Sequence, residues 1–476
     1  MESTVIQNRT GTGGVLKVAS PVTDALSDTG ATNDSGLFAP AFGTGTDTFA
    51  PNPVNEGGMI SDENPDLMPE DADSTDTAAV PADSTEGNVK EASKHIWRIT
   101  PVLGTGYAHD SNIYLSNTNP IGTTIFSMSA GGVFEAGDYR DHRDNYIEAG
   151  YLGIGNLYGS ASSQNSYNQF GNLSAQYRWE RLRVQWNSLY SYANMPNRYS
   201  GGFLTTLSLF NSLRCLYEYS EKTALECALS QRSSIYTTSG GYNSYFNQVL
   251  TGADYTFTRK VRLGLEGIVG SNPAEDSPTR YYQIVNGRLR YDISGKLSLK
   301  AAGGLQGSEY ASGGAPFRIT PVLSLGADYK LFADSKAGET RAPDTGIPLF
   351  GAGKMRQLVT DSSISLTLYR NQQVSPNMQG QDYIATGAEI GFNKAFGRHW
   401  FFNFSVGWEN DSYLANSQNV SATRTDNYFF LKPGITYQFL KHYALTVFYE
   451  NSMNNSTMQY YTWVDNRAGV ELKSSF

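Results

Sequence analysis

Polar and apolar side chains alternate with a period of two along most of the chain, from residue 96 to the last residue. The final segment, 464–476, shows the pattern well, with one face made of Val464, Ala468, Val470, Leu472 and Phe476. The other face carries Asp465, Arg467, Glu471 and Lys473. Because successive side chains of a strand point to opposite sides, this alternation predicts a β-strand with one apolar and one polar face.

Eighteen segments of this kind can be assigned, with short turns and longer loops alternating between them. The predicted strands are 96–108, 123–136, 144–157, 166–180, 181–194, 203–219, 222–235, 243–258, 260–270, 280–293, 296–309, 315–331, 356–370, 381–396, 400–411, 427–439, 442–452 and 460–476. Turns are tight at 180–181 and 440–441, whereas the connections at 109–122 and 412–426 are long. This arrangement is typical of bacterial outer-membrane barrels, in which an even strand number puts both chain ends on the short-turn rim.

These features predict an all-β fold, a transmembrane antiparallel up-and-down β-barrel of about 18 strands. We expect the strand at 460–476 to pair with the strand at 96–108 and so close the barrel. Sixteen strands are an alternative, because Arg98-Ile-Thr-Pro-Val-Leu recurs at 318–323 in a strand of opposite predicted direction. The connection at 332–355 is also unusually long for the short-turn rim.

A soluble β-propeller or β-sandwich would also give many alternating strands. A propeller would repeat a signature roughly every 40 to 50 residues, and the sequence has no such repeat. No segment reaches the roughly 18 to 20 consecutive apolar residues of a transmembrane helix. Charges keep to the polar faces, and a charge on a lipid-facing side would cost roughly 2 to 4 kcal/mol at mid-bilayer. The pattern therefore favours a membrane barrel over a soluble all-β binding protein.

Residues 1–94 differ in composition from the rest of the chain. They contain 16 acidic and 4 basic residues, a net charge of −12, which leaves +3 for residues 95–476 within the total of −9. Apolar residues are too few there to offset the entropy cost of ordering. We expect a disordered acidic linker or tail at 1–94, with a plug or docking segment as alternatives, and the barrel at 95–476. The first residues lack the basic start and apolar core of a secretory signal peptide.

One short motif and the end of the chain resemble a known family. The motif is Tyr-Ala-His-Asp-Ser-Asn-Ile-Tyr at 107–114, and strands with alternating Tyr and Gly follow it as far as the terminal Phe476. Together they resemble the beta-barrel porin type 2 family of bacterial outer-membrane proteins. The resemblance implies a place in the lipid of the bacterial outer membrane. It also implies insertion by the barrel assembly machinery through a signal at Val470, Leu472 and Phe476.

The polar faces would line a lumen, because a barrel of about eighteen strands is wide enough for an aqueous channel. Its basic residues come from the fifth to the twelfth predicted strand: Arg183, Arg214, Arg232, Arg262, Arg288, Arg290, Lys300 and Arg318. Its acidic residues come from later strands: Glu389, Glu409 and Glu450. A basic wall that faces an acidic wall would produce a transverse field across the pore. The alternative is local pairing of charges, for example between Arg262 and Glu266.

We therefore expect a porin-like channel for passive diffusion of small hydrophilic solutes through a charged lumen. The alternative is a non-conducting structural or adhesive barrel. The sequence has no motif of an enzyme, a metal site, a cofactor site or a nucleic-acid-binding module, so none of these is expected. His109 with Asp110 comes nearest to a catalytic pair. A homo-oligomer is expected only by analogy with porins.

The two cysteines, Cys215 and Cys227, lie on the apolar faces of consecutive predicted strands. A turn centred on residue 221 places them opposite each other. In an oxidising compartment they could form a cross-strand disulfide. The alternative is a pair of reduced thiols that face lipid.

Overall fold

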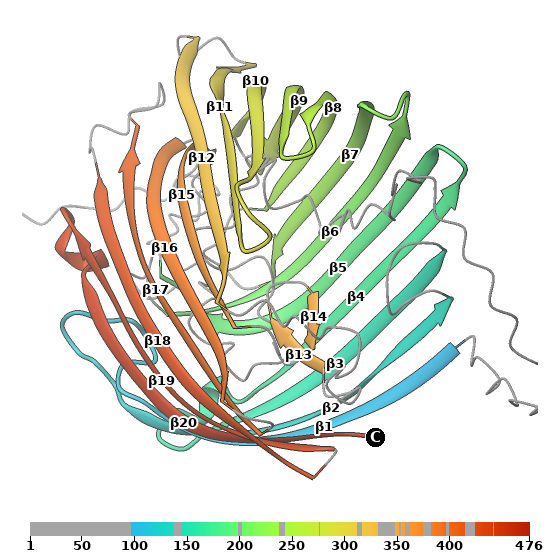
Figure 1. Ribbon diagram of the computed structural model, residues 1–476. Helices are drawn as coiled ribbons and strands as arrows, with labels where there is room; N and C mark the ends of the chain where they lie inside the picture. Colours follow the sequence, from blue (N-terminus) through green and yellow to red (C-terminus); the bar gives the residue numbers. More distant parts are fainter. Residues whose placement is uncertain are drawn as a thin grey trace, which may run out of the picture.

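The barrel strands form one closed antiparallel sheet of 18 strands (Figure 1). The computed structural model describes residues 97–137, 145–198, 202–237, 243–275, 277–311, 317–331, 348–351, 354–357, 362–374, 382–396, 399–414, 424–440 and 442–476. The acidic tail predicted at 1–94 lies outside these residues. The predicted number of eighteen strands is confirmed, and the alternative of sixteen is wrong.

The strands follow one another around the barrel in sequence order. They are β1 (Trp97–Asp110), β2 (Thr123–Gly137), β3 (Tyr146–Tyr158), β4 (Ser166–Trp179), β5 (Leu182–Pro196), β6 (Phe203–Glu218), β7 (Thr223–Tyr236), β8 (Ser244–Thr258), β9 (Val261–Ala274), β10 (Ser277–Asp292), β11 (Leu297–Tyr310), β12 (Arg318–Lys330), β15 (Ser363–Val374), β16 (Asp382–Phe396), β17 (Trp400–Tyr413), β18 (Thr425–Phe439), β19 (Tyr443–Ser456) and β20 (Trp463–Ser475). Between β12 and β15 the chain forms a separate two-stranded hairpin of β13 (Pro348–Gly351) and β14 (Lys354–Gln357). The strand predicted at 356–370 therefore begins later, at Ser363.

The barrel closes between its first and last strands, as the sequence predicts. β20 pairs with β1 from Val102↔Ser475 to Asp110↔Arg467, and the backbone N–H of Phe476 donates to the carbonyl of Pro101 at 3.2 Å. The C-terminus and the tight turns lie on one rim, which we call the short-turn rim. The opposite end carries connections such as 111–122 and 457–462, and we call it the long-loop rim.

The repeated hexapeptide lies in β1 and β12, which run in opposite directions. Its side chains nevertheless face the same way in both copies. Thr100 and Thr320 are buried toward the inside, whereas Ile99 and Ile319 are exposed on the outside. The physical reason is that successive side chains of a strand point to alternate faces of the sheet. This alternation is the same whichever way the strand runs.

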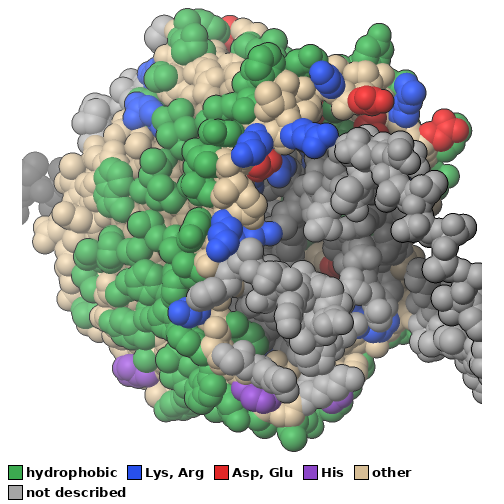
Figure 2. Space-filling view, in the orientation of Figure 1, with side chains coloured by type: hydrophobic (Ala, Val, Ile, Leu, Met, Phe, Trp, Pro, Cys, Tyr) green, Lys and Arg blue, Asp and Glu red, His purple; other side chains and the backbone are tan. Residues whose placement is uncertain are grey.

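The outer face of the barrel is apolar and the inner face is polar. Val464 on β20 and Phe476 just after it are 52% and 55% exposed, whereas Arg467 and Lys473 on β20 are 5% and 2% exposed. Hydrophobic side chains cover much of the wall in Figure 2, and Lys and Arg gather along its edge. Among the residues that the structure describes, no helix has the length and apolar composition needed to cross a membrane.

Candidate functional site

The interior of the barrel is the candidate site. The structure places all of the predicted lumen charges on the face opposite the exposed apolar side chains, from Arg183 on β5 to Glu450 on β19. Their surroundings differ along the barrel. Ion pairs between neighbouring strands line the half near the short-turn rim. Side chains that reach across the interior fill the half near the long-loop rim.

Arg288 on β10 is the centre of the first group. Its Nη1 lies 3.0 Å from carboxylate oxygens of both Glu226 and Glu266, and its Nη2 lies 3.0 Å from Asp254. Arg214 adds a second cation, because its Nε lies 2.7 Å from Glu226. The planar guanidinium has several donors in fixed directions, which suits it to hold three carboxylates at once. We call these five residues the Arg288 cluster.

Two glycines make room for the Arg288 cluster. Gly252 on β8 and Gly264 on β9 occupy inward positions, where a Cβ atom would lie 2.9 Å from Nη2 and 3.1 Å from Nε of Arg288. Arg288 is the register partner of Gly264, so its side chain crosses the wall over the position of the missing Cβ. In the sequence, these glycines and this arginine lie on strands with the ordinary alternation of polar and apolar residues. Only the pairing of the strands shows that they are neighbours.

The walls predicted as basic and as acidic each also carry charges of the opposite sign. On the predicted basic wall, Lys300 lies 3.1 Å from Asp328, and Arg288 is surrounded by carboxylates. On the predicted acidic wall, Glu450 lies 2.8 Å from Lys432. Both walls therefore contain charges of both signs. Glu266 pairs with Arg288, whereas the sequence suggested Arg262. The reason is distance: a diagonal neighbour on the adjacent strand lies about 7 to 8 Å away, whereas a residue four positions along the same strand lies roughly 13 Å away.

Near the long-loop rim, Arg198 bridges the interior. It follows the end of β5, yet its guanidinium forms ion pairs with Glu409 and Asp411 of β17, the latter at 2.8 Å. Along the shorter way around the barrel, seven strands separate β5 from β17. The Arg198 carbonyl also accepts a hydrogen bond from Nε1 of Trp463 at 3.2 Å. Only 1% of the Arg198 side chain is exposed, so its ion pairs with β17 are buried.

A second buried arginine, Arg424, stands just before β18. Its Nε donates to Asp426 at 2.9 Å, and its guanidinium lies 3.4 Å from the ring centroid of Tyr461. Burial alone would lower the pKa of Arg424, but Tyr413 and Asp426 raise it above its ordinary value. The guanidinium therefore stays charged, as both the ion pair and the cation–π contact require.

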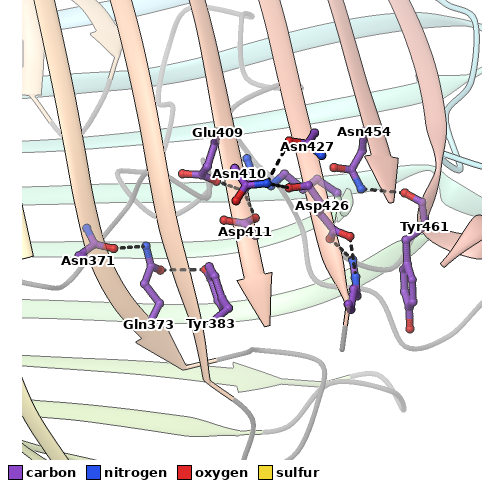
Figure 3. A network of polar contacts seen from close by, with 12 residues as sticks. Asn371, Gln373, Tyr383, Glu409, Asn410, Asp411, Asp426, Asn427, Asn454 and Tyr461 are labelled. Atoms are coloured by element: carbon purple, nitrogen blue, oxygen red, sulfur yellow. Dashed lines mark hydrogen bonds and ion pairs between the residues drawn. The ribbon is translucent and has the colours of Figure 1, made fainter. Parts of the chain in front are cut away.

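The two arginines serve neighbouring carboxylates. Asp411 and Asp426 are register partners on β17 and β18, and Figure 3 shows them side by side with Glu409 close by. Like charges directly opposite each other destabilise a sheet. Arg198 pairs with Asp411 and Arg424 pairs with Asp426, so each carboxylate has a cation of its own. We call Arg198, Arg424, Glu409, Asp411 and Asp426 the lumen bridge.

Apolar side chains cross the same half of the interior. Leu204 of β6 packs against Tyr369 of β15 and against Tyr383, Ala385 and Tyr413 of β16 and β17. The rings of Tyr383 and Tyr413 stack with centroids 5.2 Å apart. Tyr369 donates a hydrogen bond to Glu409, which joins this cluster to the lumen bridge. Sequence reasoning did not find this contact, because alternation reports the face of a residue and not its partner across the barrel.

The conspicuous 107–114 motif fixes the first long loop. Asn112 donates from Nδ2 to the carbonyls of Ser116 at 2.9 Å and Val464 at 3.0 Å, which ties the loop to β20. Leu115 packs with Tyr428, Phe430 and Trp463 on the inner wall. His109 and Asp110 do not form a catalytic pair, because successive strand residues point to opposite faces. In the part of the chain that the structure describes, no group of three or more His, Cys, Asp or Glu side chains could hold a metal ion.

Cys215 and Cys227 are direct register partners on β6 and β7. Their side chains point outward, as the sequence indicates, and both are free thiols in the structure. The cross-strand disulfide stays a prediction.

The chain matches no protein-family model and no curated protein. It is similar to crystal structures of Pseudomonas aeruginosa OccK3 (OpdO), with 12% identity, a TM-score of 0.40, and coverage of 80% of this chain and 95% of that chain. Acinetobacter baumannii OccAB3 has 10% identity and a TM-score of 0.41, with coverage of 80% and 99%. Pseudomonas aeruginosa OpdQ has 11% identity and a TM-score of 0.39, with coverage of 80% and 98%. Similarities this weak carry no argument about function.

Proposed function

We propose that the chain forms a porin-like channel of the bacterial outer membrane, through which small hydrophilic solutes diffuse passively. The observation that carries the proposal is the closed barrel of 18 strands with an apolar outside and ion pairs along its inside. An apolar outer wall suits lipid, and a polar inner wall suits water. Barrels of 16 to 18 strands are, as a rule, wide enough for an aqueous channel.

The Arg288 cluster supports a selective role for the half of the lumen near the short-turn rim. Its two arginines are positively charged hydrogen-bond donors, and its three carboxylates are negatively charged acceptors. All five lie within one patch of the wall. Such a patch can replace part of the hydration shell of a polar or zwitterionic solute. The proposal includes no catalytic residue, no cofactor and no nucleic acid.

The family, the assembly signal and the role of the acidic tail are also proposals. Membership of the beta-barrel porin type 2 family rests on the 107–114 motif and the terminal Phe476. Val470, Leu472 and Phe476 would be read by the barrel assembly machinery from their exposed outer face, where Phe476 is 55% exposed. The acidic tail at 1–94 would serve as a linker on the side of the short-turn rim, where the barrel begins.

A non-conducting barrel is the second candidate, because the lumen bridge and the Leu204 cluster cross the interior. Two measurements distinguish the two candidates. The purified full chain is reconstituted into planar lipid bilayers, and single-channel current is recorded. Discrete conductance steps, together with swelling of liposomes in small sugars but not in large ones, are expected for the channel. A correctly folded barrel that gives neither result would overturn the proposal in favour of a structural or adhesive role.

A further inference from the structure

A row of polar side chains crosses the outer face of five neighbouring strands. Each member is the register partner of the next, from β5 to β9: Ser188, Asn211, Gln231, Asn247 and Ser271. We call this row the polar ladder. All five residues point outward, because each lies two positions from an outward apolar residue on its own strand, such as Leu213, Leu229 or Val269.

The polar ladder lies within the apolar wall and not at its edge. On β6, Asn211 is flanked by Leu209, which is 36% exposed, and Leu213, which is 42% exposed. On β7, Gln231 is flanked on one side by Leu229, which is 51% exposed. A groove of about 600 Å³ runs over the ladder, with Trp186 and Tyr281 among its lining residues. The groove therefore brings four ladder residues, Asn211, Gln231, Asn247 and Ser271, together with apolar side chains of the wall.

Carboxamides in this position need partners, because a polar group surrounded by hydrocarbon and left without a hydrogen bond is unfavourable. The hydroxyl of Ser188 donates to Oδ1 of Asn211 at 2.8 Å. Within the described residues, the side chains of Gln231 and Asn247 make no hydrogen bond. On the outer face, these two carboxamides are open to a partner that lies against the barrel wall.

We propose that the polar ladder is the docking surface for a second copy of this chain. A carboxamide carries a donor and an acceptor on one group, so a row of Asn and Gln is complementary to another copy of itself. The groove provides the space that protruding side chains of the second copy need. The inference depends on the proposed outer-membrane location, but it does not depend on conduction.

Symmetry restricts how two copies can meet at the polar ladder. Two copies inserted in the same direction are related by rotation about an axis along the membrane normal. Strands of such barrels are tilted by about 35 to 45°, so a row perpendicular to them climbs across the wall. On the facing copy the row climbs the opposite way, and the two rows cross at the symmetry axis. The inference places the axis at Gln231, the third of the five ladder residues, so that Gln231 of one copy lies next to Gln231 of the other.

Cysteine cross-linking of the full chain tests the inference. Cys215 and Cys227 share the outer face and are first replaced by alanine. Gln231→Cys is then compared with Val447→Cys, an outward position on β19 that is 52% exposed and lies on the far side of the barrel. Both variants are reconstituted in phosphatidylethanolamine and phosphatidylglycerol vesicles and oxidised with copper phenanthroline. We expect a covalent dimer from Gln231→Cys and a monomer from Val447→Cys.

Other outcomes overturn the inference. Equal dimer yields from both positions would indicate random collision. A monomer at position 231 whose thiol reacts with a membrane-soluble maleimide would indicate that lipid covers the ladder. A second measurement is independent of cysteine: Gln231→Leu should make the chain monomeric in analytical ultracentrifugation, whereas Asn427→Leu, at an exposed outward carboxamide on β18, should not. The barrel band on unheated gels verifies folding, and failure of conduction would leave these outcomes unchanged.

Discussion

Asp411 and Asp426 face each other directly on β17 and β18, and each is paired with a different buried arginine. Neither arginine belongs to a barrel strand. Arg198 follows β5 and Arg424 precedes β18, so both come from connections on the long-loop rim. Two carboxylates that would repel each other thus tie two loops to the inner wall.

Replacing Arg198 should open the lumen. Arg198→Ala removes the side chain that joins β17 to the opposite wall, and water can then enter between them. Removing one partner of a buried ion pair also costs roughly 3 to 5 kcal/mol of stability. We expect a larger single-channel conductance together with a lower temperature of barrel unfolding.

The matched control is Arg98→Ala. Arg98 pairs with Glu135 at 2.7 Å, but the two residues are register partners on adjacent strands. Its loss should leave conductance unchanged. If Arg198→Ala conducts like the unaltered chain, the lumen bridge does not limit the pore.

Ion selectivity should respond to Arg288. Arg288→Ala leaves Glu226, Glu266 and Asp254 with one fewer cation, so the lumen becomes more negative at this point. Cations should then be favoured, which a reversal-potential measurement in a salt gradient detects. Arg290→Ala is the comparison, because its contact with Asp292 is longer, at 3.5 Å, and both side chains are more than one-third exposed. Equal reversal potentials for Arg288→Ala and the unaltered chain would contradict a role of the cluster in selectivity.

A single methyl group should disturb the same cluster without removing a charge. The Cβ of Gly264→Ala would overlap the Asp254 carboxylate and lie 3.1 Å from Nε of Arg288. Overpacking of this kind typically costs about 1 to 3 kcal/mol. We expect a lower unfolding temperature and a shift in selectivity in the same direction as for Arg288→Ala. At Gly287 the nearest atom to an added Cβ is 3.9 Å away, so Gly287→Ala should behave like the unaltered chain.

Phe476 should matter more for assembly than for stability. Its ring packs against His442 and Tyr443 with centroids 5.9 Å from each, contacts worth about 0.5 to 1.5 kcal/mol. Phe476→Ala should reduce the amount of folded barrel in cells, measured as the band that shifts on heating. The purified variant should still refold in detergent. Failure of refolding in detergent would instead assign Phe476 a structural role.

Oxidation should join Cys215 and Cys227. They are register partners on adjacent strands, and a disulfide that closes a short loop adds on the order of 2 to 4 kcal/mol. We expect no reactive thiol in the chain denatured without reductant after export to an oxidising compartment, and a lower unfolding temperature after reduction. Two reactive thiols under these conditions would show that the pair stays reduced.

Alternation along the chain was sufficient to predict eighteen strands and the closure between β1 and β20. It could not predict the partners of the lumen charges. Glu226 and Asp254 meet Arg288 only because β7, β8 and β10 are held in a particular register, and two inward glycines clear the way. Arg198 was missed because a loop residue has no periodic pattern that indicates where it reaches. Gly264 opposite a long basic side chain is the signal that could have pointed to the Arg288 cluster.

The hexapeptide shared by β1 and β12 bears on how such a chain could have arisen. Barrels that grow by copying hairpins add strands in pairs, and a copied segment then keeps its direction. Arg98 and Arg318 begin the same six residues in strands that run in opposite directions, so copying of hairpins cannot relate them. The two hexapeptides therefore share the same inward and outward side chains without sharing a strand direction.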